Sequence, residues 1–256
     1  MQWLSVRRLV ASGIVAGALL AGVTSGPGLA PAKATLKHAV ATPTGNWAGY
    51  VSTNPGVTYV EGSWVVPDAG SLPPGASANW VGIGGYSAQD LIQTGTQQVS
   101  SPIDNFVAGG AYSAWYELLP AGPVDLPGTV NPGDLMVASI ASVGGNSSWR
   151  ISITDVGNWS YSTVVSYVSS ESSAEWVFEA PSAFGLVPVP VGGVGQTLFD
   201  GGDFVAYGGP WQTPGDAGAI PVTAVPVETT PSALDGLGDG FYVCAYALSC
   251  SPPANS

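Results

Sequence analysis

Residues 135–154 read LMVASIASVGGNSSWRISIT, two apolar or alternating runs separated by a turn rich in glycine and asparagine. Successive strand residues point to opposite faces, so the alternation over residues 149–154 is typical of a half-buried strand. The cluster Gly144-Gly145-Asn146 predicts a hairpin turn between residues 135–140 and residues 149–154. The stretch therefore indicates a pair of antiparallel strands.

The rest of the chain repeats this pattern. Further strand-like runs occupy residues 161–168 and 174–178, and clusters of Gly, Asn, Asp and Pro separate the runs. The chain has 36 Gly and 22 Pro, spread throughout, and these residues disfavour long helices. Many short strands predict an all-β fold, with one sandwich or barrel domain over residues 46–246.

The first residues have the three parts of a secretory signal. Arg7 and Arg8 form the basic start, residues 9–23 form an apolar run, and Ala32-Lys33-Ala34 fits a cleavage site. We expect a signal peptide over residues 1–34 and a secreted, extracellular product. An uncleaved membrane anchor is the alternative.

Two short segments flank the predicted domain. Residues 35–45 are expected to be a lead-in or a short pro-segment, and residues 247–256 a flexible tail. Cys244 and Cys250 enclose a short loop near this tail. Export favours a disulfide between them, and two free thiols are the alternative.

The charge balance excludes some partners. Without residues 1–34, only Lys37 and Arg150 remain as basic residues against 17 Asp and Glu. Such a surface repels nucleic acid and anionic membranes, so we expect neither as a partner. It also suits an acid environment, because few native ion pairs can be lost on acidification.

The chain offers few catalytic groups apart from carboxylates and amides. His38 is its only histidine and lies in the leader-like region, and both cysteines lie near the end. A Ser-His-Asp set, a Cys-His pair and a multi-histidine zinc site all need imidazole. We therefore expect no metal, and any catalysis must rest on carboxylates and amides.

Two strand-like segments carry carboxylates on apolar faces. Over residues 112–119, alternation places Trp115 and Glu117 on one face. Glu175 and Glu179 likewise share a face, about 13 Å apart along the strand. A glycosidase needs two carboxylates about 5–9.5 Å apart, so this pair disfavours that class. A lectin-like binding module is a further alternative.

Six segments, taken in chain order, resemble the eqolisin family of glutamic peptidases, the family of scytalidoglutamic peptidase. They are NWAG at 46–49, VEGSWVVP at 60–67, WVGIGG at 80–85, LIQTG at 91–95, AWYE at 114–117 and AEWVFE at 174–179. The resemblance covers roughly residues 46–210 and is closest to a bacterial-type member.

The resemblance implies a β-sandwich of two curved antiparallel sheets, of the concanavalin A-like or jelly-roll type, with the active site on the concave face. It implies an acid endopeptidase that hydrolyses protein or peptide substrates without metal or cofactor, and we expect a monomer. Gln93 and Glu175 would be the catalytic dyad. Trp80, Trp115 and Glu117 would contact the substrate or support the dyad.

The chain departs from the family pattern at three positions. Gly84 stands where the W-V-G-I-D-G pattern has Asp, Gln97 stands where Asp is frequent, and Leu119 stands where Tyr is common. The first two changes remove acid near the expected site, which leaves the pH optimum and the cleavage preference open. The alternative function is a non-catalytic carbohydrate- or peptide-binding sandwich, a degenerate eqolisin, which Gly84 favours.

Overall fold

The structure is a computed structural model that describes residues 36–37, 45–70, 74–100, 104, 111–183, 187–188, 191–192, 194–224 and 229–254. They belong to the unit Ala34–Ser256. Within them the regular elements are strands, and no α-helix occurs. The described part of the chain accordingly has no helix long and apolar enough for a membrane span. The predicted signal peptide and its cleavage site lie outside the described residues, as does most of the predicted lead-in.

A seven-stranded antiparallel sheet contains the segments that carry Gln93 and Glu175. Its strand order is β16 (Ile220–Val222), β2 (Trp47–Ser52), β11 (Ala174–Glu179), β4 (Ala76–Gly84), β5 (Leu91–Val99), β6 (Tyr112–Leu118) and β7 (Val124–Asp125). The order brings β11 next to β4, although some ninety residues separate them in the chain.

The second sheet has eight strands and includes the predicted hairpin. Its order is β10 (Trp159–Ser166), β9 (Ser148–Asp155), β8 (Leu135–Ser142), β3 (Val57–Val65), β14 (Gln196–Ala206), β18 (Phe241–Cys244) and β17 (Thr230–Pro231), with β15 (Trp211–Gln212) paired to β14. The predicted hairpin is confirmed, because β8 and β9 pair antiparallel with Ile140 opposite Ile151. A small separate sheet joins β1 (Leu36–Lys37), β12 (Ser182–Ala183) and β13 (Val187–Pro188).

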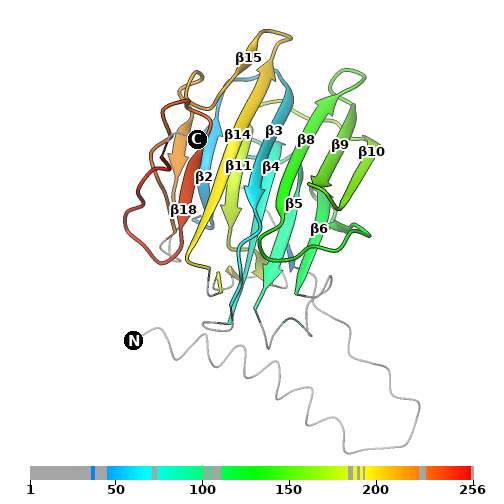
Figure 1. Ribbon diagram of the computed structural model, residues 1–256. Helices are drawn as coiled ribbons and strands as arrows, with labels where there is room; N and C mark the ends of the chain where they lie inside the picture. The colour runs from blue at the N-terminus through cyan, green and yellow to red at the C-terminus, as the bar shows by residue number, and fades with distance from the viewer. Residues whose placement is uncertain are drawn as a thin grey trace, which may run out of the picture. The chain divides into compact units, whose positions relative to one another are not determined.

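The two large sheets pack face to face around one apolar core (Figure 1). Alternation supplies this core: Trp149, Ile151 and Ile153 of β9 are fully buried, and the residues between them are not. Trp176 of β11 spans the two layers and donates a hydrogen bond from Nε1 to the carbonyl oxygen of Glu61 on β3, at 2.7 Å. The predicted all-β sandwich is confirmed.

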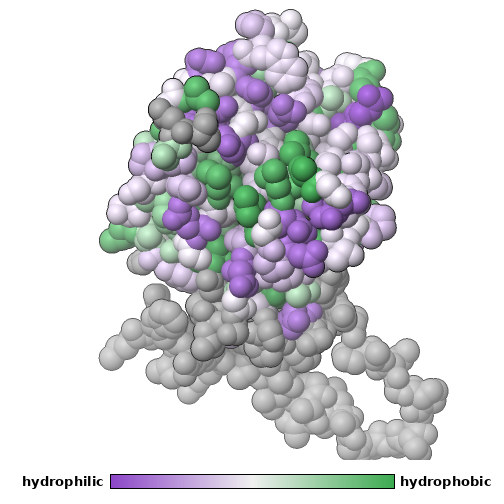
Figure 2. Space-filling view, viewed as in Figure 1, coloured by the Kyte–Doolittle hydropathy of each residue, from purple (hydrophilic) through white to green (hydrophobic). Residues whose placement is uncertain are grey.

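The outer face of the eight-stranded sheet mixes polar and apolar side chains (Figure 2). Val65, Leu135 and Val137 are exposed there, and strand pairing places Val65 directly opposite Leu135. Polar residues such as Ser63 and Ser139 lie beside them on the same strands. This face is therefore typical of a solvated sheet surface.

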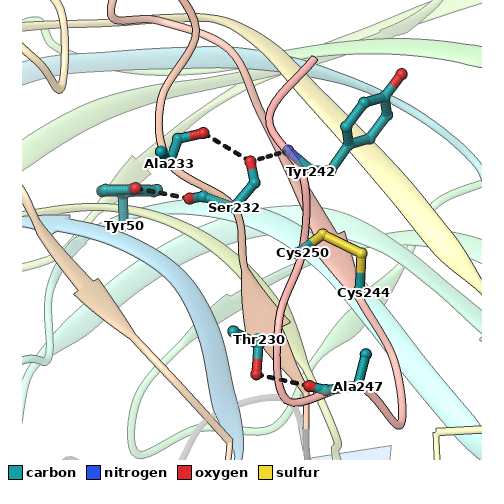
Figure 3. The surroundings of a disulfide bond; sticks show 8 residues. All are labelled: Tyr50, Thr230, Ser232, Ala233, Tyr242, Cys244, Ala247 and Cys250. Carbon is teal, nitrogen blue, oxygen red and sulfur yellow. Dashed lines mark hydrogen bonds between the residues drawn. A yellow bond between two sulfur atoms is a disulfide. The ribbon is translucent and has the colours of Figure 1, made fainter.

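Cys244 and Cys250 form a disulfide, with an S–S distance of 2.05 Å, so the favoured alternative is the correct one. The loop that it closes is also held by Thr230 of β17, whose hydroxyl donates to the carbonyl oxygen of Ala247 at 2.7 Å (Figure 3). On the neighbouring loop, the Tyr50 hydroxyl donates to the carbonyl oxygen of Ser232. Part of the segment predicted as a tail is thus attached to the eight-stranded sheet.

Candidate active site

One row of residues, the dyad row, crosses the seven-stranded sheet and contains both predicted catalytic groups. Glu117 on β6 pairs with Gln93 on β5, Gln93 pairs with Gly82 on β4, and Gly82 pairs with Glu175 on β11. Directly opposed residues of an antiparallel pair point to the same face. The row lies on the face away from the other sheet, because its strand neighbours Ile83, Ile92 and Trp176 belong to the core between the sheets.

Gly82 makes the gap between the two predicted catalytic groups. Gln93 and Glu175 lie two strands apart, so their Cα atoms are about 10 Å from each other. A Cβ atom on Gly82 would lie 2.9 Å from Cζ3 of Trp80 and 3.3 Å from Oε2 of Glu175. The tip of the Trp80 indole thus lies over Gly82 between the amide and the carboxylate, and a side chain at position 82 would displace it.

Glu117 fixes the orientation of the Gln93 amide. The Nε2 atom of Gln93 donates to Oε2 of Glu117 at 2.9 Å, and both side chains are fully buried. The Oε1 atom of Gln93 is buried and has no hydrogen-bond partner within the described structure. The amide thus keeps its carbonyl oxygen and one N–H available for another group.

Glu175 is a fully buried carboxyl group on the other side of the gap. Burial raises its pKa well above the usual range, and the charge of Asp90 adds to this effect. The Ser173 hydroxyl and the Tyr86 backbone amide lie near enough to lower the pKa, although by less. Within the described structure, no donor lies at an ordinary hydrogen-bond distance and angle from either carboxyl oxygen. Glu175 is therefore placed to hold a proton.

Trp80 and Trp115 lie on the same face of the sheet as the dyad row, two residues along their strands from Gly82 and Glu117. Both pair with Gly95 of β5, where a Cβ atom would lie only 2.1 Å from the carbonyl oxygen of Asn79. The two indoles therefore flank a position on β5 that has no room for a side chain. With Leu91, Leu119 and other apolar residues they form an apolar cluster beside the dyad row.

Glu179 is a third buried carboxyl group on this face. Strand geometry predicted that it lies about 13 Å from Glu175 along the same strand. Its Oε2 accepts a hydrogen bond from Nε1 of Trp80 at 2.8 Å, and its Oε1 accepts one from Nδ2 of Asn46 at 2.9 Å. Burial raises the pKa of Glu179 well above the usual range, and the charge of Glu117 adds to this. Glu179 therefore holds the indole that lies over Gly82.

The three departures from the family pattern all lie near this face. Gln97 and Leu119 are buried, and Leu119 belongs to the apolar cluster. Beside Leu119, the Tyr167 hydroxyl donates to its carbonyl oxygen at 2.8 Å and accepts from the backbone N–H of Leu91 at 2.7 Å. Gly84 ends β4 with a φ of 83°, a backbone conformation that favours glycine.

Sequence reasoning missed Gly82, Asn46 and Asp90 as parts of the site. Their roles depend on strand pairing, which one sequence without its partners does not specify. The alternation that grouped Glu175 with Glu179 was the one signal that pointed toward the buried carboxyl of Glu179.

One group of acidic side chains has the spacing of metal ligands among the described residues. It contains Asp200, Asp235 and Asp239, whose ligand atoms lie within 4.8 Å of one another. Asp200 belongs to β14 of the eight-stranded sheet, and the other two precede β18 of the same sheet. The group is therefore separate from the strands that carry Gln93 and Glu175.

Comparisons with known proteins agree with this arrangement. The sequence model of the Peptidase A4 family matches residues 45–224, which is most of the chain and includes every residue of the dyad row. The chain belongs to the Peptidase A4 family. The resemblance to glutamic peptidases and the predicted enzyme class are thereby confirmed. A comparison with curated proteins found no significant match.

Solved structures of glutamic peptidases and of an eqolisin peptidase share the fold. Scytalido-glutamic peptidase with a peptide-based transition-state analog is 21% identical, with a TM-score of 0.63, and the match covers 78% of this chain and 98% of that one. SCP-B, a member of the eqolisin family in complex with the tripeptide Ala-Ile-His, is 20% identical, with a TM-score of 0.60 and the same coverage. Aspergilloglutamic peptidase from Aspergillus niger is 23% identical, with a TM-score of 0.54, and the match covers 67% of this chain and 99% of that one.

Proposed function

We propose that this protein is a secreted, acid-type endopeptidase in which Gln93 and Glu175 hydrolyse peptide bonds as a dyad. The observation that carries the proposal is the row in which one glycine, Gly82, separates a buried amide from a buried carboxyl group. A water molecule and a peptide carbonyl need such a gap between two groups that can each form hydrogen bonds. The peptide-bound structure of SCP-B supports peptides as ligands of this fold.

The two side chains divide the chemistry of hydrolysis. In the fraction of molecules in which Glu175 is ionised, its carboxylate takes a proton from water as the water oxygen bonds to the carbonyl carbon. Gln93 accepts a hydrogen bond from that water through Oε1, and its free N–H donates to the oxyanion that forms. Glu175 then returns the proton to the leaving nitrogen, the C–N bond breaks, and the carboxylate is regenerated. Glu117 holds the amide in the required orientation.

Access to the dyad requires a conformational step. Gln93, Glu175 and Trp80 are all fully buried, so a peptide reaches them only after the surrounding structure opens. Burial also removes water that would otherwise screen the oxyanion, so each donor stabilises the tetrahedral intermediate more strongly than in solution.

The direct test is digestion of a denatured protein between pH 2 and pH 7, with mass mapping of the fragments. The proposal predicts new internal peptide ends, equal rates with and without EDTA, and no release of reducing sugar from β-glucans. Tight peptide binding without cleavage at any pH would instead support the binding-module alternative. Cleavage that EDTA abolishes and zinc restores would reject the dyad.

Secretion is tested separately. The N-terminal sequence of protein recovered from the culture medium should begin after Ala34, or further along if residues 35–45 are removed as a pro-segment. A secreted product that still begins at Met1 would contradict this part of the proposal. Sedimentation should show a monomer, the state that we expect from the family resemblance.

A further inference from the structure

The end of β4 nearest the dyad is occupied by an acidic group from another part of the chain. Gly84 lies two residues after Gly82, so the two positions point to the same face of the sheet. A Cβ atom on Gly84 would lie 2.7 Å from the carbonyl oxygen of Asp90 and 3.1 Å from Oδ2 of Asp90. The space beside Gly84 is therefore filled by Asp90, which lies in the β4–β5 connection.

Two contacts hold this carboxylate and its strand in place. Oδ2 of Asp90 accepts a hydrogen bond from the backbone N–H of Ser170 at 2.6 Å, in the segment that leads into β11. The next residue, Leu91, begins β5 and donates its backbone N–H to the Tyr167 hydroxyl at 2.7 Å. Asp90 thus connects the start of the strand that carries Gln93 to the approach of the strand that carries Glu175.

We infer that Asp90 is a positioning residue of the dyad, an acidic group that stands beside Gly84 and sets the pH range in which Glu175 acts as a base. The inference rests on the proposed function of Glu175. It corrects the expectation that Gly84 removes acid from this end of the site, because the carboxylate comes from Asp90, six residues later in the chain. An L-residue at position 84 would be strained at the observed φ of 83°.

The distances are short enough for an electrostatic effect. The Glu175 carboxyl lies beside position 82 and the Asp90 carboxyl beside position 84, and positions two residues apart on a strand are about 6.6 Å apart. Burial is the largest cause that raises the pKa of Glu175, and the charge of Asp90 raises it further, although by less than the hydrogen-bonding groups of Ser173 and Tyr86 lower it. The other acidic groups on this face are Glu117 on β6, Glu179 on β11 itself and Asp125 on β7, which pairs with Trp115. The seven strands of this sheet carry no Lys or Arg. No basic group on the sheet offsets the Asp90 charge.

The test is the pH dependence of kcat/KM for four variants, measured on a peptide without ionisable side chains. Asp90→Asn keeps the size of the side chain and an acceptor for Ser170, and it removes the charge. The acid limb, where Glu175 ionises, should move to lower pH by about half a unit to one unit, with little change in the maximum. Asp90→Glu should keep the wild-type limb. Asp90→Ser is a second neutral variant and should move the limb as Asp90→Asn does.

Asp68→Asn is the matched control, because Asp68 also accepts a backbone N–H, from Gly70 at 2.8 Å, in the loop before β4. It should leave the profile unchanged. An acid limb that stays in place in both neutral variants, with Glu175→Gln inactive, overturns the role of Asp90 and leaves the dyad standing. Full activity in Glu175→Gln overturns the dyad itself, whatever the profile of the Asp90 variants.

Discussion

Replacing Gly82 by alanine tests the gap between Gln93 and Glu175. The added Cβ atom would lie 2.9 Å from Cζ3 of Trp80, 3.0 Å from Cδ1 of Leu91 and 3.3 Å from Oε2 of Glu175. Ordinary contacts begin at 3.4 Å, so the two apolar side chains must move by about 0.5 Å and the carboxyl group by less.

Two effects follow from these distances. Overpacking of this size costs about 1–3 kcal/mol of the free energy of unfolding, and about 2–4 °C of Tm per kcal/mol in a domain of this length. The methyl group would lie between the Gln93 amide and the Glu175 carboxyl, where the attacking water must bind, and misplacing reacting groups by about 1 Å costs about 10²-fold in rate. We expect kcat/KM to fall at least about 10²-fold while the protein remains folded.

Gly62→Ala is the matched control. On β3 of the other sheet, its Cβ atom would lie 2.9 Å from Cδ1 of Trp176 and 3.1 Å from Cγ1 of Val81, contacts as tight as those at Gly82 but without a carboxylate. Both variants should lose a similar amount of Tm, and only Gly82→Ala should lose most of its activity at a temperature where both are folded. Wild-type kcat/KM in Gly82→Ala would refute the reasoning, because hydrolysis would then not need this gap.

Three further predictions concern the other buried or linked groups. Glu179→Gln keeps the shape but cannot accept hydrogen bonds from both Trp80 and Asn46, so the free energy of unfolding should fall by about 1–3 kcal/mol in urea titrations. Its activity should fall much less than that of Glu175→Gln, and an equal loss would place Glu179 among the catalytic groups. Burial raises the pKa of both Glu175 and Glu179, so the native state keeps protons that the unfolded chain releases above about pH 4.3. Tm should therefore decrease as the pH rises from about 4.3 toward neutrality, and a Tm that increases over this range would contradict the assignment. Cys250→Ser opens a loop with a sequence separation of 6, so it should cost about 2 kcal/mol or less and leave kcat/KM unchanged; lost activity would show that this loop supports the site.

Local patterns predicted the fold because they report which face of a strand is buried. Ile151 and Ile153 alternate with Arg150 and Ser152, and the structure places the isoleucines in the core. Beyond the β8–β9 hairpin, the sequence did not predict which strands are neighbours. β11 lies between β2 and β4, and these pairings join distant segments of the chain. A strand's own residues do not specify such partners.

Because strand partners could not be predicted, only part of the site could be predicted from the sequence. Gln93 and Glu175 were identified from family-like motifs around each residue, and the structure brings them to one row. Gly82 gave no chemical signal, because its contribution is the absence of a side chain between two strands. No motif pointed to Asp90, and only the folded chain shows that its carboxylate stands beside Gly84.

The central claim is that Gln93 and Glu175 act as one catalytic unit, and a double-mutant cycle of kcat/KM tests it most directly. Glu175→Gln removes the proton acceptor, and Gln93→Ala removes the water's acceptor and the oxyanion's donor, so each should lower kcat/KM at least about 10³-fold on an unfolded protein substrate. The double variant should be scarcely worse than either single variant, with all three folded and still binding peptide. Near-wild-type turnover in Glu175→Gln, or losses that simply multiply in the double variant, would contradict the account.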